Sequence, residues 1–238
     1  MNKHHSLPRI DDPISRRTML RSGAAAVVAA AGLPLPSFAV ARPVHTGIAN
    51  VLVSHDRYGV HVGPSVAANP RDPRQLLAAC QAAPTGNPQL IATYLSFDAG
   101  ATWHNGGLPR PPAGKAVAGD DVTVAFDPHG RGYLCASATG SSDADRALYA
   151  WRTDDGGHSF SAPVTLLAGQ YFDAPWIAAG AGRTSSERNV YVVWASNAHE
   201  GGDSVAMTLS TDGGQTFRPP RTILDAHRPT TQSEPGRF

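Results

Sequence analysis

The octapeptide SFDAGATW, Ser96–Trp103, recurs twice more along the chain with the same order of residue types. The second copy is TDDGGHSF, Thr153–Phe160, and the third is STDGGQTF, Ser210–Phe217. In each copy a Ser or Thr is followed by Asp, Gly, a second Ser or Thr, and an aromatic residue. The aspartates stand at positions 98, 155 and 212, which are 57 residues apart. A fixed period of that size is typical of a protein built from stacked repeats.

The composition of the motif predicts a tight turn between two antiparallel strands. An Asp can fold its carboxylate back onto nearby backbone N–H groups, and the Gly can take a left-handed conformation. We expect the closing aromatic residue to start the next strand and to bury its ring between sheets. The residues with this structural role are Ser96, Asp98, Gly100, Thr102 and Trp103; Thr153, Asp155, Gly157, Ser159 and Phe160; and Ser210, Asp212, Gly214, Thr216 and Phe217.

The first 41 residues have the order of an export signal. Arg16 and Arg17 form a twin-arginine pair ahead of an alanine-rich apolar run, and Ala39 and Ala41 supply the small residues of a cleavage site. The apolar run, about a dozen residues, is too short to span a bilayer. We expect export to the periplasm or the medium through the twin-arginine translocase, without a stable membrane anchor. A disordered basic tail is the alternative.

The charge pattern excludes some classes of partner. The whole chain has 20 Lys and Arg against 19 Asp and Glu, a formal net charge of +1. No run of like charge occurs, so nothing points to nucleic acid or to an anionic membrane surface. The sequence also lacks a phosphate-binding glycine loop, a paired-cysteine zinc pattern and a nucleophile elbow. We therefore expect no cofactor and no metal.

The two cysteines, Cys80 and Cys135, are expected to be buried free thiols. They fall in different repeat units. When the units are aligned on Leu77, Tyr133 and Tyr191, Cys80 is one position out of step with Cys135. Because neighbouring strand positions face opposite sides of a sheet, a disulfide between these cysteines is not expected.

Each 57-residue unit contains four short β-type runs separated by Gly, Pro and Asp turns. Four antiparallel strands per repeat, with a turn-borne Asp motif, predict the blade of a β-propeller, and a solenoid is the alternative. We expect the signal at 1–41 and the propeller at 42–238, with blades at about 60–117, 118–170 and 171–228 and a fourth beginning at 229–238. The expected strands are 65–68, 75–81, 90–96 and a weaker run from 103; 122–126, 132–138, 147–153 and 160–167; and 176–179, 190–196, 204–210 and 217–224.

The three octapeptides resemble the Asp-box, or bacterial neuraminidase repeat, of sialidase-superfamily propellers. The segments YFDAPWIA at 171–178 and NVYVVW at 189–194 are similar to the first and second strands of blades in that superfamily. VAANPRDPRQL at 66–76 and DDVTVAFDP at 120–128 resemble the same elements in other blades. The resemblance covers roughly residues 50–238 and implies an all-β propeller of sialidase type. About three and a half blades are present, an incomplete ring, so a truncated propeller is expected.

The resemblance implies an arginine triad that grips a substrate carboxylate, an Asp acid/base, and a Tyr nucleophile polarised by a Glu. In the superfamily the nucleophile and the last arginine come from late blades, which this chain does not contain, and the first-blade Arg-Ile-Pro element is missing. The remaining catalytic candidates are Asp120, Asp121 and Asp173, which stand just before first strands and could instead bond to neighbouring backbone. The substrate-binding candidates are Arg57, Arg110 and Arg183, with a solvated surface position as the alternative.

Two functions remain open at this stage. One is an exported exo-sialidase-like glycoside hydrolase, of which this chain would be the N-terminal half and inactive alone. The other is a non-catalytic Asp-box propeller that binds a glycan or a protein outside the cytoplasm. A non-functional remnant is a third possibility.

Overall fold

Three four-stranded antiparallel sheets make up the part of the chain that the structure describes. This computed structural model describes residues 50–87, 90–170, 172–184, 187–197 and 203–225; for residues 118–121, 143, 197, 203 and 225 it describes the backbone alone. The expected export signal, with its Arg16, Arg17, Ala39 and Ala41, and the expected start of a fourth blade at 229–238 lie outside the described residues.

Each sheet is a simple meander, in which strands follow one another in chain order, and we call the sheets blades 1 to 3. Blade 1 contains β1 (Val60–Asn69), β2 (Asp72–Ala83), β3 (Leu90–Ser96) and β4 (His104–Asn105). Blade 2 contains β5 (Ala116–Phe126), β6 (Gly132–Thr139), β7 (Ala147–Thr153) and β8 (Val164–Ala168), with a 3-10 turn at Asp143–Asp145. Blade 3 contains β9 (Asp173–Ala181), β10 (Arg188–Asn197), β11 (Asp203–Ser210) and β12 (Arg221–Asp225).

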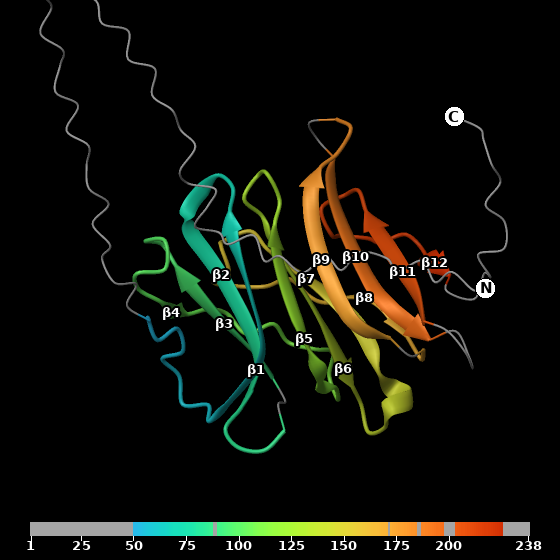
Figure 1. Cartoon of the computed structure of the whole chain (residues 1–238), viewed down its shortest axis with the longest axis horizontal. Helices are drawn as coiled ribbons and strands as arrows, with labels where there is room; N and C mark the ends of the chain where they lie inside the picture. Colours follow the sequence, from blue (N-terminus) through green and yellow to red (C-terminus); the bar gives the residue numbers. More distant parts are fainter. Residues whose placement is uncertain (1–49, 88–89, 171, 185–186, 198–202, 226–238) are drawn as a thin grey trace, which may run out of the picture. The chain divides into compact units, whose positions relative to one another are not determined.

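The blades pack face to face, with their first strands side by side. Strand β5 contacts β1 on one side and β9 on the other (Figure 1). Successive residues of a strand point to opposite faces. In β6, Leu134 and Ala136 pack into a buried apolar cluster shared with blade 1, whereas Tyr133 and Cys135 pack into a cluster shared with blade 3. The prediction of an all-β propeller is confirmed.

The Asp-box turns use one hydrogen-bond pattern three times. In the second turn, Asp155 Oδ1 accepts hydrogen bonds from the Thr153 hydroxyl at 2.8 Å and the Ser159 amide at 2.9 Å. The Ser159 hydroxyl donates to Asp155 Oδ2 at 2.5 Å, and the Gly157 amide donates to the Thr153 hydroxyl at 2.8 Å. The bonds in the first and third turns join the equivalent atoms.

These turns stabilise the charged form of their aspartates. Hydrogen bonds from the Thr102 hydroxyl and amide lower the pKa of Asp98 to about 2. For Asp155 and Asp212, burial raises the pKa, but the hydroxyl and amide donors outweigh it, and the pKa is again about 2. Each carboxylate is therefore an ionised cap on its own turn.

The aromatic residue that closes each turn does not start the next strand in any of the three blades, although in blade 1 the strand β4 begins at His104, directly after Trp103. Phe160 and Phe217 pack against the clusters between blades, but β8 begins at Val164 and β12 at Arg221. Proline explains the delay, because Pro163 and the Pro219–Pro220 pair have no backbone N–H to donate to a strand ladder. The expected strand starts at 160 and 217 are therefore wrong.

The two thiols lie on opposite sides of their sheets. Cys80 belongs to a cluster on the side of blade 1 away from blade 2, and Cys135 lies between blades 2 and 3. Both are buried and free. Burial raises the pKa of each thiol, so both are held as neutral SH groups. Within the described ranges, no helix is long and apolar enough to cross a membrane.

Candidate functional site

The first strands of the three blades meet around a cavity of about 410 Å³. Strand pairing shows which residues of the three strands are equivalent. Ser65 pairs with Ala79, Thr123 with Cys135, and Trp176 with Val193, each between the first and second strand of its blade. The chain therefore presents Ser65, Thr123 and Trp176 at one repeat position, and all three line the cavity. In a propeller this is the lining of the central channel.

The polar groups of this cavity are few. The Ser65 hydroxyl accepts a hydrogen bond from the Val124 amide at 3.2 Å and so ties blade 1 to blade 2. Thr123 is only 7% exposed, and its hydroxyl has no hydrogen-bond partner among the described residues. A buried hydroxyl without a partner costs free energy, so this group is available to a ligand or to a water molecule.

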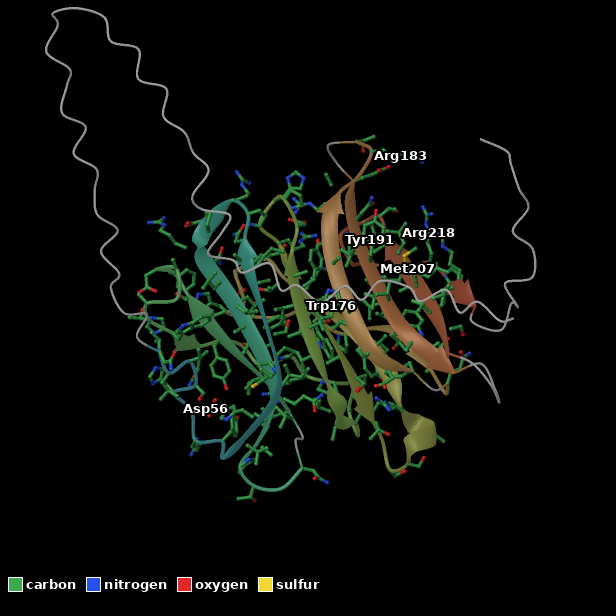
Figure 2. All side chains as sticks on the ribbon, viewed as in Figure 1. Asp56, Trp176, Arg183, Tyr191, Met207 and Arg218 are labelled. Carbon is green, nitrogen blue, oxygen red and sulfur yellow. The ribbon has the colours of Figure 1, made fainter. Side chains whose placement is uncertain are left out.

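Trp176 supplies a large aromatic surface at the cavity. Trp176, labelled in Figure 2, is 66% exposed. The next residue of the strand, Ile177, points to the opposite face of the sheet and is buried. A concave site with an aromatic wall and a small number of polar groups is the usual form of a small-molecule site. The lining otherwise consists of Gly, Pro, Val and Ala.

Asp173 places a carboxylate at the start of the same strand. The side chain is exposed, and its Oδ1 accepts a hydrogen bond from the Ala174 amide at 2.9 Å. Ala174 also lines the cavity and has a φ of 46°, which is a left-handed conformation. The next residue is Pro175. A residue before proline normally stays extended, so the backbone is strained where the chain enters the cavity.

The other two candidate carboxylates are placed only by their backbone. Asp120 and Asp121 lie in β5, between Val117 and Val122, where the pairing register with β6 shifts. Val122 lines the cavity, and Asp121 directly precedes Val122 in the sequence. The side chains of Asp120 and Asp121 lie outside the described residues.

None of the three candidate arginines lines the cavity, and all three are exposed, which fits the alternative of a solvated surface position. Arg57 lines a separate polar cavity before β1, and Arg110 lies beside the second Asp-box turn. Arg183 follows the far end of β9 from Asp173, and its amide donates to Glu187 Oε2 at 2.7 Å (Figure 2). Strand direction separates Arg183 from Asp173, because the two ends of a nine-residue strand are roughly 25 Å or more apart. Asp173 and Arg183 cannot share a pocket.

A partly buried polar cluster also lies outside the candidate site. Asp56 accepts hydrogen bonds from the Tyr94 hydroxyl at 2.6 Å, the Tyr58 amide at 2.9 Å and, at 3.2 Å, the ring of His61. Burial raises the pKa of Asp56, but these donors outweigh it and the pKa is lowered. The pKa of Tyr94 is raised, first by burial and then by its bond to Asp56. This cluster fastens the segment before β1 to blade 1.

Among the described residues, no group of three or more His, Cys, Asp or Glu side chains is arranged to hold a metal ion. The cavity is lined by the indole ring of Trp176 and the hydroxyls of Ser65 and Thr123, and the exposed Asp173 carboxylate stands at the start of the strand that carries Trp176.

Comparison with solved structures places this arrangement among known folds. The alpha-L-arabinanase of Penicillium chrysogenum complexed with arabinobiose matches with a TM-score of 0.55 and 14% identity, over 71% of this chain and 51% of that chain. The GH93 alpha-L-arabinofuranosidase of Fusarium graminearum, also with arabinobiose, matches with a TM-score of 0.50 and 12% identity, over 70% of this chain and 50% of that chain. The chain shares the β-propeller fold of these two proteins.

The likeness is one of fold, at low sequence identity. The chain spans about half the length of these two proteins. No protein-family model and no curated protein matches the sequence. The comparison supports the expected propeller fold, whereas the expected membership of the sialidase superfamily is not shown.

Proposed function

We propose that this chain is part of an exported propeller that acts on glycans and holds a sugar at the cavity between the first strands. The observation that carries the proposal is the exposed Trp176 ring in a cavity that also has an unpartnered hydroxyl on Thr123, with the exposed Asp173 carboxylate three residues before Trp176 in the same strand. A sugar ring offers an apolar face to an aromatic side chain and hydroxyl groups to polar ones. The matching arabinanase and arabinofuranosidase structures both contain arabinobiose, which makes arabinose oligosaccharides the first ligands to test.

Two forms of this function remain to be distinguished. In the enzymatic form, a sialidase-like or arabinan-acting hydrolase, Asp173 serves as a catalytic carboxylate. Glycosidases usually need a second carboxylate about 5 to 10 Å away, and Asp120 and Asp121 are the candidates for it. In the binding form the propeller retains a glycan without hydrolysis. None of the three candidate arginines lines the cavity, which favours the binding form over a sialidase, because the carboxylate of a sialoside needs converging cations.

The test measures binding and turnover separately. Arabinobiose and a sialyl-oligosaccharide are titrated calorimetrically against the full chain, and sugar release is followed in parallel. We expect Trp176→Ala to weaken binding at least tenfold and Phe97→Ala to leave it unchanged, since Phe97 is also an exposed aromatic residue but stands on an Asp-box turn away from the cavity lining. Sugar release that Asp173→Asn abolishes, with binding retained, would establish the enzymatic form. Binding without release would establish the binding form, and binding of neither sugar would overturn the proposal.

We also propose that the chain is exported through the twin-arginine pathway. Arg16 and Arg17, the apolar run after them and the small residues Ala39 and Ala41 support the proposal. Replacing both arginines by lysine keeps the charge and should leave the protein in the cytoplasm when cells are fractionated. Unchanged appearance in the periplasm or the medium would contradict it.

A further inference from the structure

The described side chains that line the cavity between the first strands are all uncharged. The charged residues that adjoin this lining in the sequence, Asp121 before Val122 and Asp173 before Ala174, are both acidic. A carboxylate of a bound sugar would lose its water here without gaining a cation, and the negative charge of Asp173 would repel it. We therefore expect a sugar that the cavity retains to be neutral.

The backbone of the lining has few free donors for sugar hydroxyls. The Val124 amide already donates to the Ser65 hydroxyl at 3.2 Å, and the Ala174 amide donates to the side chain of the preceding residue at 2.9 Å. Pro64 and Pro175 have no backbone N–H. Hydrogen bonds to a sugar must therefore come mainly from side-chain hydroxyls.

The side chains of the lining offer two hydroxyl groups. The Ser65 hydroxyl is engaged as an acceptor and keeps one proton to donate. The Thr123 hydroxyl is buried and has no partner in the described part of the chain. A sugar hydroxyl bonded to Thr123 satisfies both groups, whereas any further sugar hydroxyl without a partner costs binding free energy. The cavity thus favours a sugar that buries few hydroxyl groups.

Most of the remaining lining is apolar. Val66, Val122 and Val124 come from the first strands of blades 1 and 2, and the Trp176 indole comes from blade 3. The volume of about 410 Å³ is in the lower part of the range of about 300–1,000 Å³ for small-molecule sites and suits one sugar residue. A methyl group on such a sugar gains by contact with the valines, whereas a hydroxymethyl group brings a hydroxyl that valine cannot bond.

We propose that the cavity selects a neutral 6-deoxyhexose, a sugar in which C5 carries a methyl group in place of the hydroxymethyl group of a hexose or the carboxylate of a uronic acid. This inference rests on the proposed function, because it names the class of sugar held at the same cavity. The valines set the preference for the methyl group, and the Thr123 hydroxyl bonds one ring hydroxyl. A pentopyranose, with hydrogen on C5, binds second best.

The test uses methyl glycosides that differ only in the group on C5. Glycosides of D-fucose, L-arabinopyranose, D-galactose and D-galacturonic acid share one ring configuration and carry methyl, hydrogen, hydroxymethyl and carboxylate. Those of 6-deoxy-D-glucose, D-xylose, D-glucose and D-glucuronic acid form a second series. Ligand-observed NMR titrations give the affinity of the full chain for each. In at least one series we expect the 6-deoxy glycoside to bind about tenfold more tightly than the hexoside, and the uronoside not to bind measurably.

Three variants locate the preference in the cavity. Thr123→Val keeps the shape of a buried side chain and should weaken the 6-deoxy glycoside about tenfold without lowering the thermal midpoint, because the lost hydroxyl has no partner within the described protein. Val66→Thr adds a hydroxyl at a 62% exposed position and should narrow the preference over the hexoside at least threefold. Val51→Thr is the matched control. Val51 is 44% exposed and does not line the cavity, so both affinities should stay unchanged.

The outcomes separate this inference from the proposed function. A 6-deoxy glycoside that binds no more tightly than the hexoside or the pentopyranoside in both series, or a uronoside that binds, would overturn the inference and leave glycan binding in place. Unchanged affinity in Thr123→Val would overturn it too. Binding of arabinobiose or of the sialyl-oligosaccharide, without binding of any of these glycosides, would have the same meaning. If no sugar binds at all, the inference and the proposed function fail together.

Discussion

At the scale of single residues, the Asp-box aspartates show how a short motif encodes a turn. Each carboxylate gathers a neighbouring hydroxyl, a second hydroxyl and a backbone amide, so a few residues satisfy one another without help from the rest of the fold. Such local bonds can be foreseen from sequence, because they depend only on residues within five positions of each other. The carboxylate is held in its charged form, which gives two measurable consequences.

Asp155→Ala should lower the free energy of unfolding by about 1–3 kcal/mol, because the Ser159 amide and two hydroxyls lose their acceptor. Urea unfolding measures the change. Asp154→Ala is the neighbouring control. It removes only an exposed pair with Arg131, and should cost less than about 1 kcal/mol. An equal loss of unfolding free energy in the two variants would contradict the role of Asp155 as the cap of its turn.

The same carboxylates should make the stability depend on pH. The pKa of Asp98, Asp155 and Asp212 is about 2 in the folded chain, below the ordinary value of 3.8. Their stabilisation is therefore complete above about pH 5 and is lost as the pH falls from about 4 to about 2. We expect the stability difference between the unaltered chain and Asp155→Asn to shrink over this interval, in urea midpoints measured at several pH values. A constant difference would show that the Asp155 carboxylate does not stay charged.

At the scale of elements, the sequence predicted strand bounds where an apolar run meets an Asp-box turn, and the prediction failed where prolines delay pairing or where the pairing register between strands sets the outcome. The bounds of β3 and β7 were predicted correctly, since an apolar run ends there at an Asp-box turn. The starts of β8 and β12 were wrong because prolines interrupt pairing after the aromatic residue. The sequence did not reveal three of the cavity residues, Ser65, Thr123 and Trp176. Their equivalent positions become visible only when the first strands of the three blades are aligned by pairing register.

The second Asp-box turn packs closely against blade 1 at Gly157. Gly157 has φ of 105°, and a Cβ there would lie 2.5 Å from Leu95 Cδ2 and 3.0 Å from Leu77 Cδ1 of blade 1. Gly157→Ala should therefore lower the thermal midpoint markedly, through backbone strain and a clash between blades. Gly169→Ala, at φ of 67° with open space around it, isolates the strain alone and should cost about 1–2 kcal/mol. If both variants lose the same stability, the contact between the turn and blade 1 is unimportant.

At the scale of the whole molecule, the blades are coupled by apolar clusters and by one buried carboxylate. Asp127, in the turn between β5 and β6, is fully buried and accepts hydrogen bonds from the Tyr133 hydroxyl at 3.0 Å and from Arg188 Nη1 of blade 3 at 3.1 Å. Burial raises the pKa of Asp127, but the Arg131 and His129 amides, Tyr133 and Arg188 outweigh it, and the pKa is lowered. The ion pair therefore fastens blade 3 to the turn of blade 2.

Removing this arginine tests whether the blades unfold together. Arg188→Met keeps most of the side-chain stem but leaves a buried carboxylate without its cation, which should cost about 2–4 kcal/mol. Arg74→Met removes an exposed pair with Asp72 within blade 1 and should cost less than about 1 kcal/mol. Hydrogen exchange reports where the loss falls. We expect the amides of β9 to β11 to lose protection first while β1 to β3 stay protected, because the broken contact joins blade 3 to the rest. A uniform loss over all three blades would mean that the described part of the propeller opens as one unit.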